Sequence, residues 1–264
     1  MIVWLQVILR LVALTCIFMS LSSVAQESSV SQKSSASHKE RPKLYFDTDE
    51  NGGWVPFLTA AELGKPGIMT EITEALQRYS NVEFVPIKLP QKRAKMALKK
   101  GSVDLDFICL EWFENGVVGP EYVLSEPFFE LTENFVTLKK NATSFPTRES
   151  FNQKRVGTVA GYFYFDEHTF IRVNFLNEDQ LMSGLKHERF EVIILEQETA
   201  KHWAKVNDVD IHFAALHSRG YFLMRLNKKY ESLLPVLNQA IRQIKSSGEL
   251  QAILDKHNTQ INIF

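Results

Sequence analysis

Short apolar runs alternate with amphipathic segments from Arg41 onward, and this alternation is the sequence feature that most constrains the fold. Strand-like runs are expected at residues 43–46, 83–87, 103–109, 134–138, 155–159, 172–175, 191–195, 211–214 and 220–226. Several of these strands are separated by segments with helical periodicity. Strands separated by helices indicate parallel βαβ units, in which helices cover a sheet. The sequence therefore predicts an α/β protein.

The helical segments are recognised by the spacing of their apolar residues and by their ends. Ile68, Ile72 and Leu76 recur every four residues and share one helix face. Pro90 suits a first helical turn, and Gly101 ends the helix that follows. Two further helices are expected near the C-terminus, where apolar stripes are formed by Leu233, Leu237, Ile241, Ile244, Leu250, Ile253 and Leu254.

The N-terminal residues have the features of an export signal. Residues 2–24 are interrupted only by Gln6 and Arg10 and contain no acid, and the small residues that end at Ala25 offer a cleavage site. We therefore expect a signal peptide at 1–25 and export of the rest of the chain. Because the apolar run nearly reaches membrane-spanning length, an uncleaved membrane anchor is the alternative. Residues 26–40 are rich in serine and lack aromatics, which is typical of a flexible linker.

Composition limits the remaining possibilities. The chain has 264 residues, enough for one large domain or two modest ones, and its 30 basic and 31 acidic residues argue against nucleic-acid binding. Of the 2 cysteines, Cys16 lies in the expected signal peptide, which leaves Cys109 alone. The exported chain would have no internal disulfide, so its core must hold it together. A polar stretch at 139–152 marks a boundary between two α/β lobes.

Several motifs resemble those of the family 3 solute-binding proteins, the periplasmic amino-acid-binding-like components of ABC transporters. The resemblance runs from about residue 44 to 258. It is carried by the order and spacing of Trp54-Val55-Pro56-Phe57, Gly67-Ile68 with Glu71-Ile72, Pro90 with Arg93-Ala94, Leu98, Gly101 and Asp104, Ser125-Glu126-Pro127-Phe128-Phe129, and Val156-Gly157 with Gly161-Tyr162.

The resemblance implies a two-lobed periplasmic binding protein fold of type II, with the ligand cleft between the lobes. Lobe 1 would comprise residues 41–138 and 223–264, and lobe 2 residues 139–222. Such a protein would be a monomer that captures a small molecule by hinge closure and delivers it to an ABC transporter permease. Closure follows because the ligand gains contacts from both lobes only in the closed state.

Loops that follow strands carry the first candidate ligand-binding residues, because open α/β sheets bind ligands at the carboxyl ends of their strands. Asp49, Trp54 and Phe57 follow the first strand, although the acids at 47–50 are more typical of a solvated turn. Glu111 and Trp112 follow the strand at 103–109. Amino-acid binders of this family usually place an arginine there to clamp a carboxylate, whereas this loop is acidic and aromatic.

The remaining candidates are an arginine, two tyrosines and an acid. Arg93 is the substitute for the missing arginine, with a structural or exposed role as the alternative. Tyr162 and Tyr164 belong to four successive aromatics, which cannot all face one core. Glu196 ends an apolar strand and matches the acid that receives the ammonium group in amino-acid binders, with a surface turn as the alternative. Together these residues suggest an amine-bearing or amino-acid-like ligand.

Motifs of other protein classes are missing from the sequence. It contains no Walker A loop, dinucleotide fingerprint, nucleophile elbow or H-E-x-x-H pair, so no cofactor, metal or catalytic residue is assigned. Two alternatives to a transport protein remain. One is a lyase-like or dehydratase-like enzyme on the same fold, with Glu111 and Glu196 as acid and base. The other is a membrane-tethered sensory module.

Overall fold

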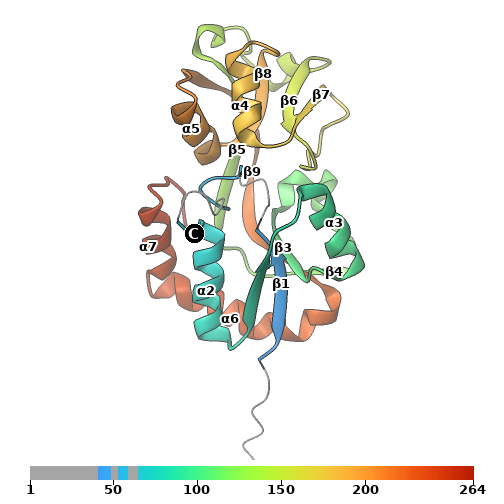
Figure 1. Cartoon of the computed structure of the whole chain (residues 1–264), viewed down its shortest axis with the longest axis vertical. Helices are drawn as coiled ribbons and strands as arrows, with labels where there is room; N and C mark the ends of the chain where they lie inside the picture. Colours follow the sequence, from blue (N-terminus) through green and yellow to red (C-terminus); the bar gives the residue numbers. More distant parts are fainter. Residues whose placement is uncertain (1–40, 49–52, 59–64) are drawn as a thin grey trace, which may run out of the picture. The chain divides into compact units, whose positions relative to one another are not determined.

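Two long antiparallel strands, β5 (Phe129–Leu138) and β9 (Ile211–Asn227), form the centre of the fold in the computed structural model (Figure 1). The structure describes residues 41–48, 53–58 and 65–264, apart from the side chain of Gln91. The predicted signal peptide, the linker and Asp49 lie outside the described residues. Within the described part, no helix combines the length and apolar character needed to cross a bilayer.

A single sheet runs through both halves of the described chain, in the order β2-β1-β3-β9-β5-β8-β6-β7, with β4 paired to β9. The outer strands on one side are β1 (Lys43–Asp47), β2 (Glu83–Ile87), β3 (Leu105–Cys109) and β4 (Tyr122–Leu124). On the other side they are β6 (Arg155–Val159), β7 (Ile171–Phe175) and β8 (Val192–Glu196). β1 pairs in parallel with β2 and β3, and β6 pairs in parallel with β7 and β8.

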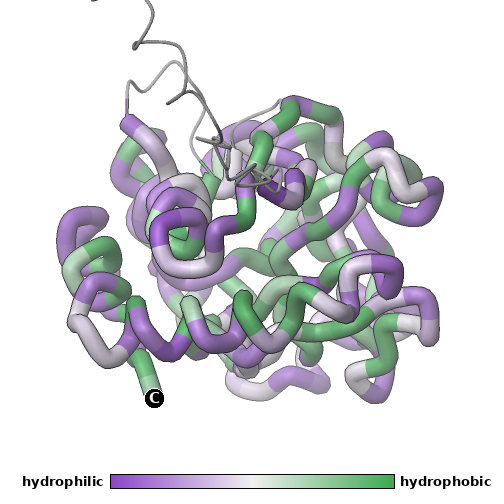
Figure 2. Tube along the Cα trace, turned by 90° about the horizontal axis from the view of Figure 1, so that it is seen from below, coloured by the Kyte–Doolittle hydropathy of each residue, from purple (hydrophilic) through white to green (hydrophobic). Residues whose placement is uncertain are grey.

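Amphipathic helices cover the sheet in each of two lobes. The first lobe contains α2 (Ile68–Ser80), α3 (Gln91–Lys100), α6 (Leu234–Ser246) and α7 (Glu249–Lys256). The second contains α4 (Glu178–Lys186) and α5 (Gln197–Val206). Hydrophilic and hydrophobic stretches alternate along the peripheral helices (Figure 2). This alternation is expected where one helix face packs on a core.

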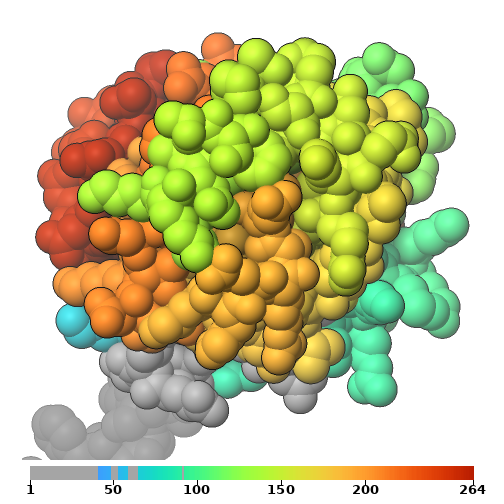
Figure 3. Space-filling model, turned by 90° about the horizontal axis from the view of Figure 1, so that it is seen from above, coloured from blue at the N-terminus to red at the C-terminus, as the bar shows by residue number. Residues whose placement is uncertain are grey.

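Each lobe has its own hydrophobic core. In the first lobe, Phe46, Ile72 and Phe222 belong to one cluster of buried side chains. In the second, one cluster includes Leu181 and Ile193, and another includes Phe135. The face shown in Figure 3 is formed mainly by the middle of the chain, which supplies β6 to β8, α4 and α5. The middle segment is thus inserted between the parts of the chain that form the first lobe.

Two bulges mark the point where β5 and β9 pass from one lobe to the other. In the pairing of these strands, Glu133 lies opposite Ser218 and Asn134 opposite Leu216, so His217 has no partner residue. A second shift in the pairing, between Phe135 and Val136, leaves Ala214 without a partner residue on β5. Bulges bend a strand and change the direction of a side chain. Here the extra residue, His217, has a side chain that is fully buried.

The structure confirms the predicted α/β class and refines several elements. Residues 211–214 and 220–226 belong to one continuous strand rather than two, because β5 pairs with β9 across both lobes. The short β4 was not predicted. The polar stretch at 139–152 forms two 3-10 turns, and the lobe boundaries proposed from the sequence stay a prediction.

Candidate functional site

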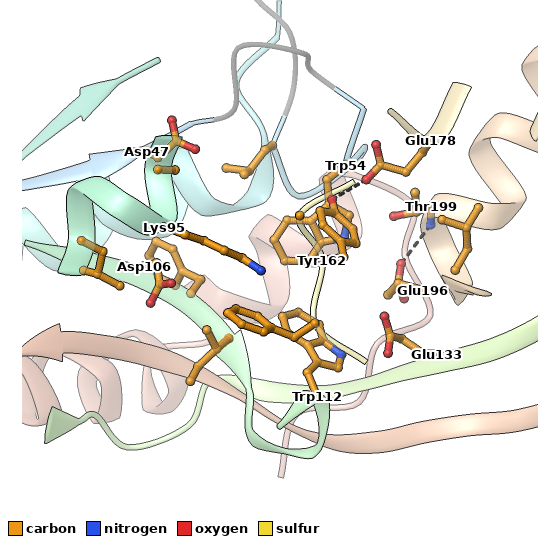
Figure 4. A pocket seen from close by; sticks show the side chains of 18 of the residues that line it. Asp47, Trp54, Lys95, Asp106, Trp112, Glu133, Tyr162, Glu178, Glu196 and Thr199 are labelled. Atoms are coloured by element: carbon orange, nitrogen blue, oxygen red, sulfur yellow. Dashed lines mark hydrogen bonds between the residues drawn. The ribbon is translucent and has the colours of Figure 1, made fainter. Parts of the chain in front are cut away.

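A cavity lies between the cores of the two lobes and has a volume of about 970 Å³, counting space open to solvent. The first lobe supplies residues of β1, the 53–58 loop, α3, β3 and the turn after it. The second lobe supplies the loop after β6, the start of α4, and the end of β8 with the start of α5. The polar and aromatic lining residues are Asp47, Trp54, Lys95, Asp106, Phe107, Trp112, Glu133, Tyr162, Phe163, Glu178, Glu196 and Thr199 (Figure 4).

Three glutamates lie on the same side of this cavity in Figure 4. Glu133 is on β5 and Glu196 ends β8, and these two residues are direct partners in the antiparallel pairing of the strands. Glu178 is at the start of α4, where it accepts a hydrogen bond from the hydroxyl of Tyr162. All three glutamates are buried. Buried carboxylates require partners, so this part of the cavity favours a ligand group that donates hydrogen bonds or carries positive charge.

Glu196 is held by the helix that it precedes. It is the N-cap of α5, and its Oε2 accepts a hydrogen bond from the backbone N–H of Thr199 at 2.9 Å. Burial outweighs this bond and raises the pKa of Glu196 from 4.5 to about 8. The carboxyl therefore carries a proton near neutral pH when the cavity is empty.

Glu133 is the inner end of a buried chain of polar groups. Its Oε2 accepts hydrogen bonds from Ser218 Oγ at 2.9 Å and from His217 Nδ1 at 3.3 Å. The other ring nitrogen of His217 is 2.8 Å from Asp166 Oδ1, and Arg148 donates to Asp166 Oδ2 at 2.7 Å. Burial opposes the imidazolium form, but the hydrogen bonds to Asp166 and Glu133 outweigh it and raise the pKa of His217.

Lys95 is the single lysine or arginine among the described residues that line the cavity. Its Nζ lies 3.1 Å from the centre of the Phe163 ring, which comes from the other lobe. Burial, followed by the positive charges of Arg172 and Arg225, lowers the pKa of Lys95 to about 7. The nearby Asp106 is neutralised by Arg225, whose Nε donates to Asp106 Oδ1 at 2.9 Å.

Aromatic side chains form the wall contributed by the first lobe. Trp54 stacks on Phe57 with ring centres 4.8 Å apart and meets Trp112 edge-on at 6.0 Å. The loop that carries Trp54 is fixed by the start of α2, where the backbone N–H of Ile68 donates to the carbonyl of Pro56 at 3.0 Å. A wall of this kind suits the apolar part or the ring of a small ligand.

Two polar atoms of lining residues are buried without a hydrogen-bond partner, namely Nε1 of Trp112 and Oγ1 of Thr199. In Figure 4 the indole nitrogen of Trp112 points toward the side of the cavity where the glutamates lie. A buried N–H without a partner is costly, and an indole N–H can only donate. A ligand that provides an acceptor atom would remove this cost.

The two lobes are in direct contact at the edge of the cavity. Trp203 on α5 donates from Nε1 to the carbonyl of Gly53 at 2.6 Å. A Cβ added at Gly53 would lie 1.9 Å from Oε2 of Glu178, so only glycine allows this approach. These contacts join the two lobes directly beside the cavity.

The structure brings four of the sequence-predicted residues together at the cavity: Trp54, Trp112, Tyr162 and Glu196. Their role in ligand binding stays a prediction. Asp49 is outside the described residues, as noted above.

Four other predicted residues lie outside the cavity lining. Phe57 is completely buried behind Trp54. Arg93 is exposed on α3, whose cavity-facing residues are Ala94, Lys95 and Leu98. Glu111 lies against Gly220, and its Oε2 accepts a hydrogen bond from Cys109 Sγ at 3.0 Å. Tyr164 is buried in the second lobe, and its hydroxyl accepts a hydrogen bond from the backbone N–H of Val159 at 3.3 Å.

Sequence reasoning missed Lys95, Glu133 and Glu178. Lys95 is three residues before the apolar Leu98, and residues three apart lie on the same face of a helix. This spacing places Lys95 on the inner face of α3. Glu133 directly precedes the strand predicted at 134–138, so this prediction leaves Glu133 outside the sheet. Glu178 is in the first turn of its helix, where an acid is ordinarily explained by the helix dipole.

The model of the bacterial extracellular solute-binding proteins, family 3, matches residues 51–260, which is most of the chain. The chain belongs to this family. It is thus a ligand-binding protein by family, as the sequence resemblance predicted. No curated protein sequence matches this solute-binding protein.

Solved structures agree with the family. A mutant of the arginine-binding protein ArgBP from T. maritima has a TM-score of 0.66 at 19% identity, covering 83% of this chain and 96% of that one. A histidine kinase sensor domain similar to periplasmic binding proteins has a TM-score of 0.72 at 12% identity, covering 86% and 100%. The ancestral amino-acid-binding protein AncCDT-1, a precursor of cyclohexadienyl dehydratase, has a TM-score of 0.64 at 18% identity, covering 81% and 94%.

At identities this low, the similarity establishes the fold of the solute-binding protein and not its ligand. The fold is the two-lobed, type II arrangement predicted from the sequence. Among the described residues, no group of three or more histidine, cysteine, aspartate or glutamate side chains has the geometry of a metal site.

Proposed function

We propose that this solute-binding protein captures a small amine-bearing or amino-acid-like metabolite in the periplasm, by closure of its lobes, for uptake through an ABC transporter permease. The observation that carries the proposal is the excess of acidic over basic side chains in the cavity lining. The described lining contains five acids (Asp47, Asp106, Glu133, Glu178 and Glu196) and one lysine, together with aromatic walls. An acidic, aromatic cavity favours a cation over an anion.

A ligand with an acceptor atom as well as an amine fits the cavity best. The unpartnered N–H of Trp112 and the ammonium form of Lys95 are both available to an oxygen of the ligand. An α-amino acid provides an ammonium and a carboxylate, and it would meet the carboxylate with Lys95 instead of the usual arginine. The arginine-binding and amino-acid-binding proteins among the similar structures support the same class of ligand.

The proposal is tested by thermal unfolding of the purified protein with a panel of compounds. The panel comprises the twenty amino acids, putrescine, tyramine, tryptamine and the deaminated analogue of each. A compound at one hundred times its Kd should stabilise the protein by about 2.7 kcal/mol. Stabilisation by at least one amine, and by none of the deaminated analogues, is the expected result. If only deaminated analogues stabilise the protein, or if no compound of the panel does, the proposal is wrong.

A sensory role is the second candidate, and it is favoured by the similarity to a histidine kinase sensor domain. N-terminal sequencing of the exported protein separates the two roles, because a tethered sensor retains its first residues. The enzyme alternative loses its proposed acid–base pair, since Glu111 lies outside the cavity that Glu196 lines. Mass spectrometry of each stabilising compound after incubation would detect any turnover.

A further inference from the structure

Glu133 and Glu196 lie directly opposite each other on adjacent strands, and both line the cavity. Opposite residues of an antiparallel pair share a face and have Cβ atoms about 4.5–5.5 Å apart. Two buried carboxylates at this spacing repel each other unless they share a proton or a cation lies between them. We propose that these glutamates form a carboxylate pair that binds the ligand's ammonium group, which displaces a proton held by the pair in the empty cavity. This inference rests on the proposed function, because it requires an amine-bearing ligand.

The surroundings of the two glutamates differ. Glu133 accepts hydrogen bonds from Ser218 and from His217 through the same oxygen. Glu196 has a backbone N–H of α5 as its partner and is 4% exposed. The raised pKa of Glu196, caused by burial, agrees with a proton on this residue at neutral pH.

Other charged groups face the pair from each neighbouring element. On α5, Glu198 forms an ion pair with Lys201 at 2.8 Å. On α4, Glu178 accepts a hydrogen bond from a tyrosine hydroxyl. On β9, His217 contacts Glu133, and on α3, Lys95 lies across the cavity. Of these groups, two are other possible sources of a proton: Lys95, whose pKa is lowered to about 7 mainly by burial, and His217, whose pKa is raised by its hydrogen bonds to Asp166 and Glu133 although burial opposes this.

The exchange conserves the charge of the site. One ammonium group enters, the O–H bond of the protonated carboxyl breaks, and its proton passes to solvent. Binding should therefore strengthen as the pH rises toward the titration of the pair. The affinity should change by about tenfold per pH unit below that point, which is the slope for one exchanged proton.

Calorimetric titration of the purified full chain measures this proton directly. L-arginine, putrescine and tryptamine serve as probes for an α-amino acid, an aliphatic diamine and an aromatic amine. Each is titrated at pH 7 in phosphate and in MOPS buffer, whose ionisation enthalpies differ and neither of which contains a primary amine. We expect at least one probe to bind, with release of close to one proton, and its Kd to fall about tenfold between pH 6 and pH 7.

Variants identify the source of the proton. Glu133→Gln and Glu196→Gln should each weaken binding of the amine by about 10- to 100-fold, as expected for loss of a charged hydrogen-bond partner, and Glu196→Gln should also abolish proton release. Lys95→Met should retain proton release. Glu130→Gln is the matched control, because Glu130 is on the same strand but outside the described lining of the cavity, and it should bind as the wild type does.

The outcomes separate this inference from the proposed function. If no amine of the thermal-unfolding panel, these three included, binds the wild type, both are wrong. If an amine binds but its enthalpy is the same in both buffers, or if Glu133→Gln binds it with unchanged affinity, the carboxylate pair is wrong while the proposed function stands. Loss of proton release in Lys95→Met, with release retained in Glu196→Gln, would assign the proton to the lysine and would also overturn the inference.

Discussion

Glu196 has two roles in the fold, as the last residue of β8 and as the N-cap of α5. Its position allows one oxygen to cap the helix while the carboxyl stays in the cavity wall. The structure therefore retains an acid in a place where its charged form is disfavoured by burial. Glutamine has nearly the same shape and can still accept the capping hydrogen bond, which makes it an informative replacement.

Glu196→Gln should stabilise the ligand-free protein at high pH. A carboxyl whose folded pKa is about 8, against an ordinary 4.5, binds more protons in the folded state than in the unfolded state between these values. Stability is therefore lost as the pH rises through this window. The variant should gain at least about 1 kcal/mol over the wild type at pH 8, the equivalent of one pKa unit. The gain should disappear at pH 4, as measured by urea denaturation at both pH values; an equal gain at both would contradict the prediction.

His217 connects two buried acids, Glu133 and Asp166. His217→Ala would leave both carboxylates without their shared partner, and breaking a buried ion pair costs about 3–5 kcal/mol. Chemical denaturation of the ligand-free protein measures this loss. The exposed His187 provides the control, because His187→Ala should change the stability by less than about 0.5 kcal/mol. A loss below about 1 kcal/mol in His217→Ala would show that the chain of polar groups is not coupled to folding.

At the scale of elements, β6 and α4 pack closely because each contributes a glycine at their contact. A Cβ at Gly157 would lie 2.6 Å from Phe190, and a Cβ at Gly184 would lie 2.8 Å from the same ring. The absence of two side chains thus makes room for one aromatic ring between a strand and a helix. Such a contact tolerates little added volume.

Gly157→Ala should destabilise the second lobe by about 1–3 kcal/mol, the usual cost of overpacking a core. Thermal unfolding of the variant measures the loss. Ser183→Ala on the neighbouring face of α4 is the control, and it should leave the stability within about 0.5 kcal/mol of the wild type. A wild-type stability for Gly157→Ala would mean that Phe190 can move away without cost.

Most helices and strands could be predicted because the sequence patterns that indicate them are local. Part of the candidate site could not, because it depends on which residues of two paired strands lie opposite each other. Apolar spacing placed α2, and Gly101 correctly ended α3, where its φ of 74° suits glycine. The partnership of Glu133 with Glu196 follows from the pairing of two strands far apart in the sequence, which no local pattern encodes. The continuity of β9 was missed for the same reason, because its polar middle, including His217, is buried only by tertiary contacts.

At the scale of the whole binding unit, residues 41–264, the two lobes together supply the cavity with groups that no single lobe could assemble. Lys95 and Trp54 come from the first lobe, while Tyr162 and Glu178 come from the second. The hydrogen bond from Trp203 to Gly53 joins the lobes at the cavity edge. Each such contact shifts the balance between open and closed states by its own free energy.

Trp203→Phe should weaken closure while retaining most of the apolar packing of the side chain. Loss of one hydrogen bond of about 1 kcal/mol corresponds to a roughly fivefold higher Kd for a bound amine. Small-angle X-ray scattering should show a larger radius of gyration for the variant at a ligand concentration that closes the wild type. Tyr79→Phe, at an exposed position on α2, should behave as the wild type in both measurements. An unchanged Kd for Trp203→Phe would mean that this contact does not contribute to closure.

The position of the tryptophans gives this molecule a built-in optical signal. Of the four in the sequence, Trp54 and Trp112 line the cavity and Trp203 contacts its edge, while Trp4 lies in the expected signal peptide. In a protein cleaved after Ala25, every remaining indole would therefore sense the arrival of a ligand or the movement of the lobes. The intrinsic fluorescence of the unlabelled protein should report binding and closure in real time, and replacing the indoles one at a time would resolve which event each of them senses.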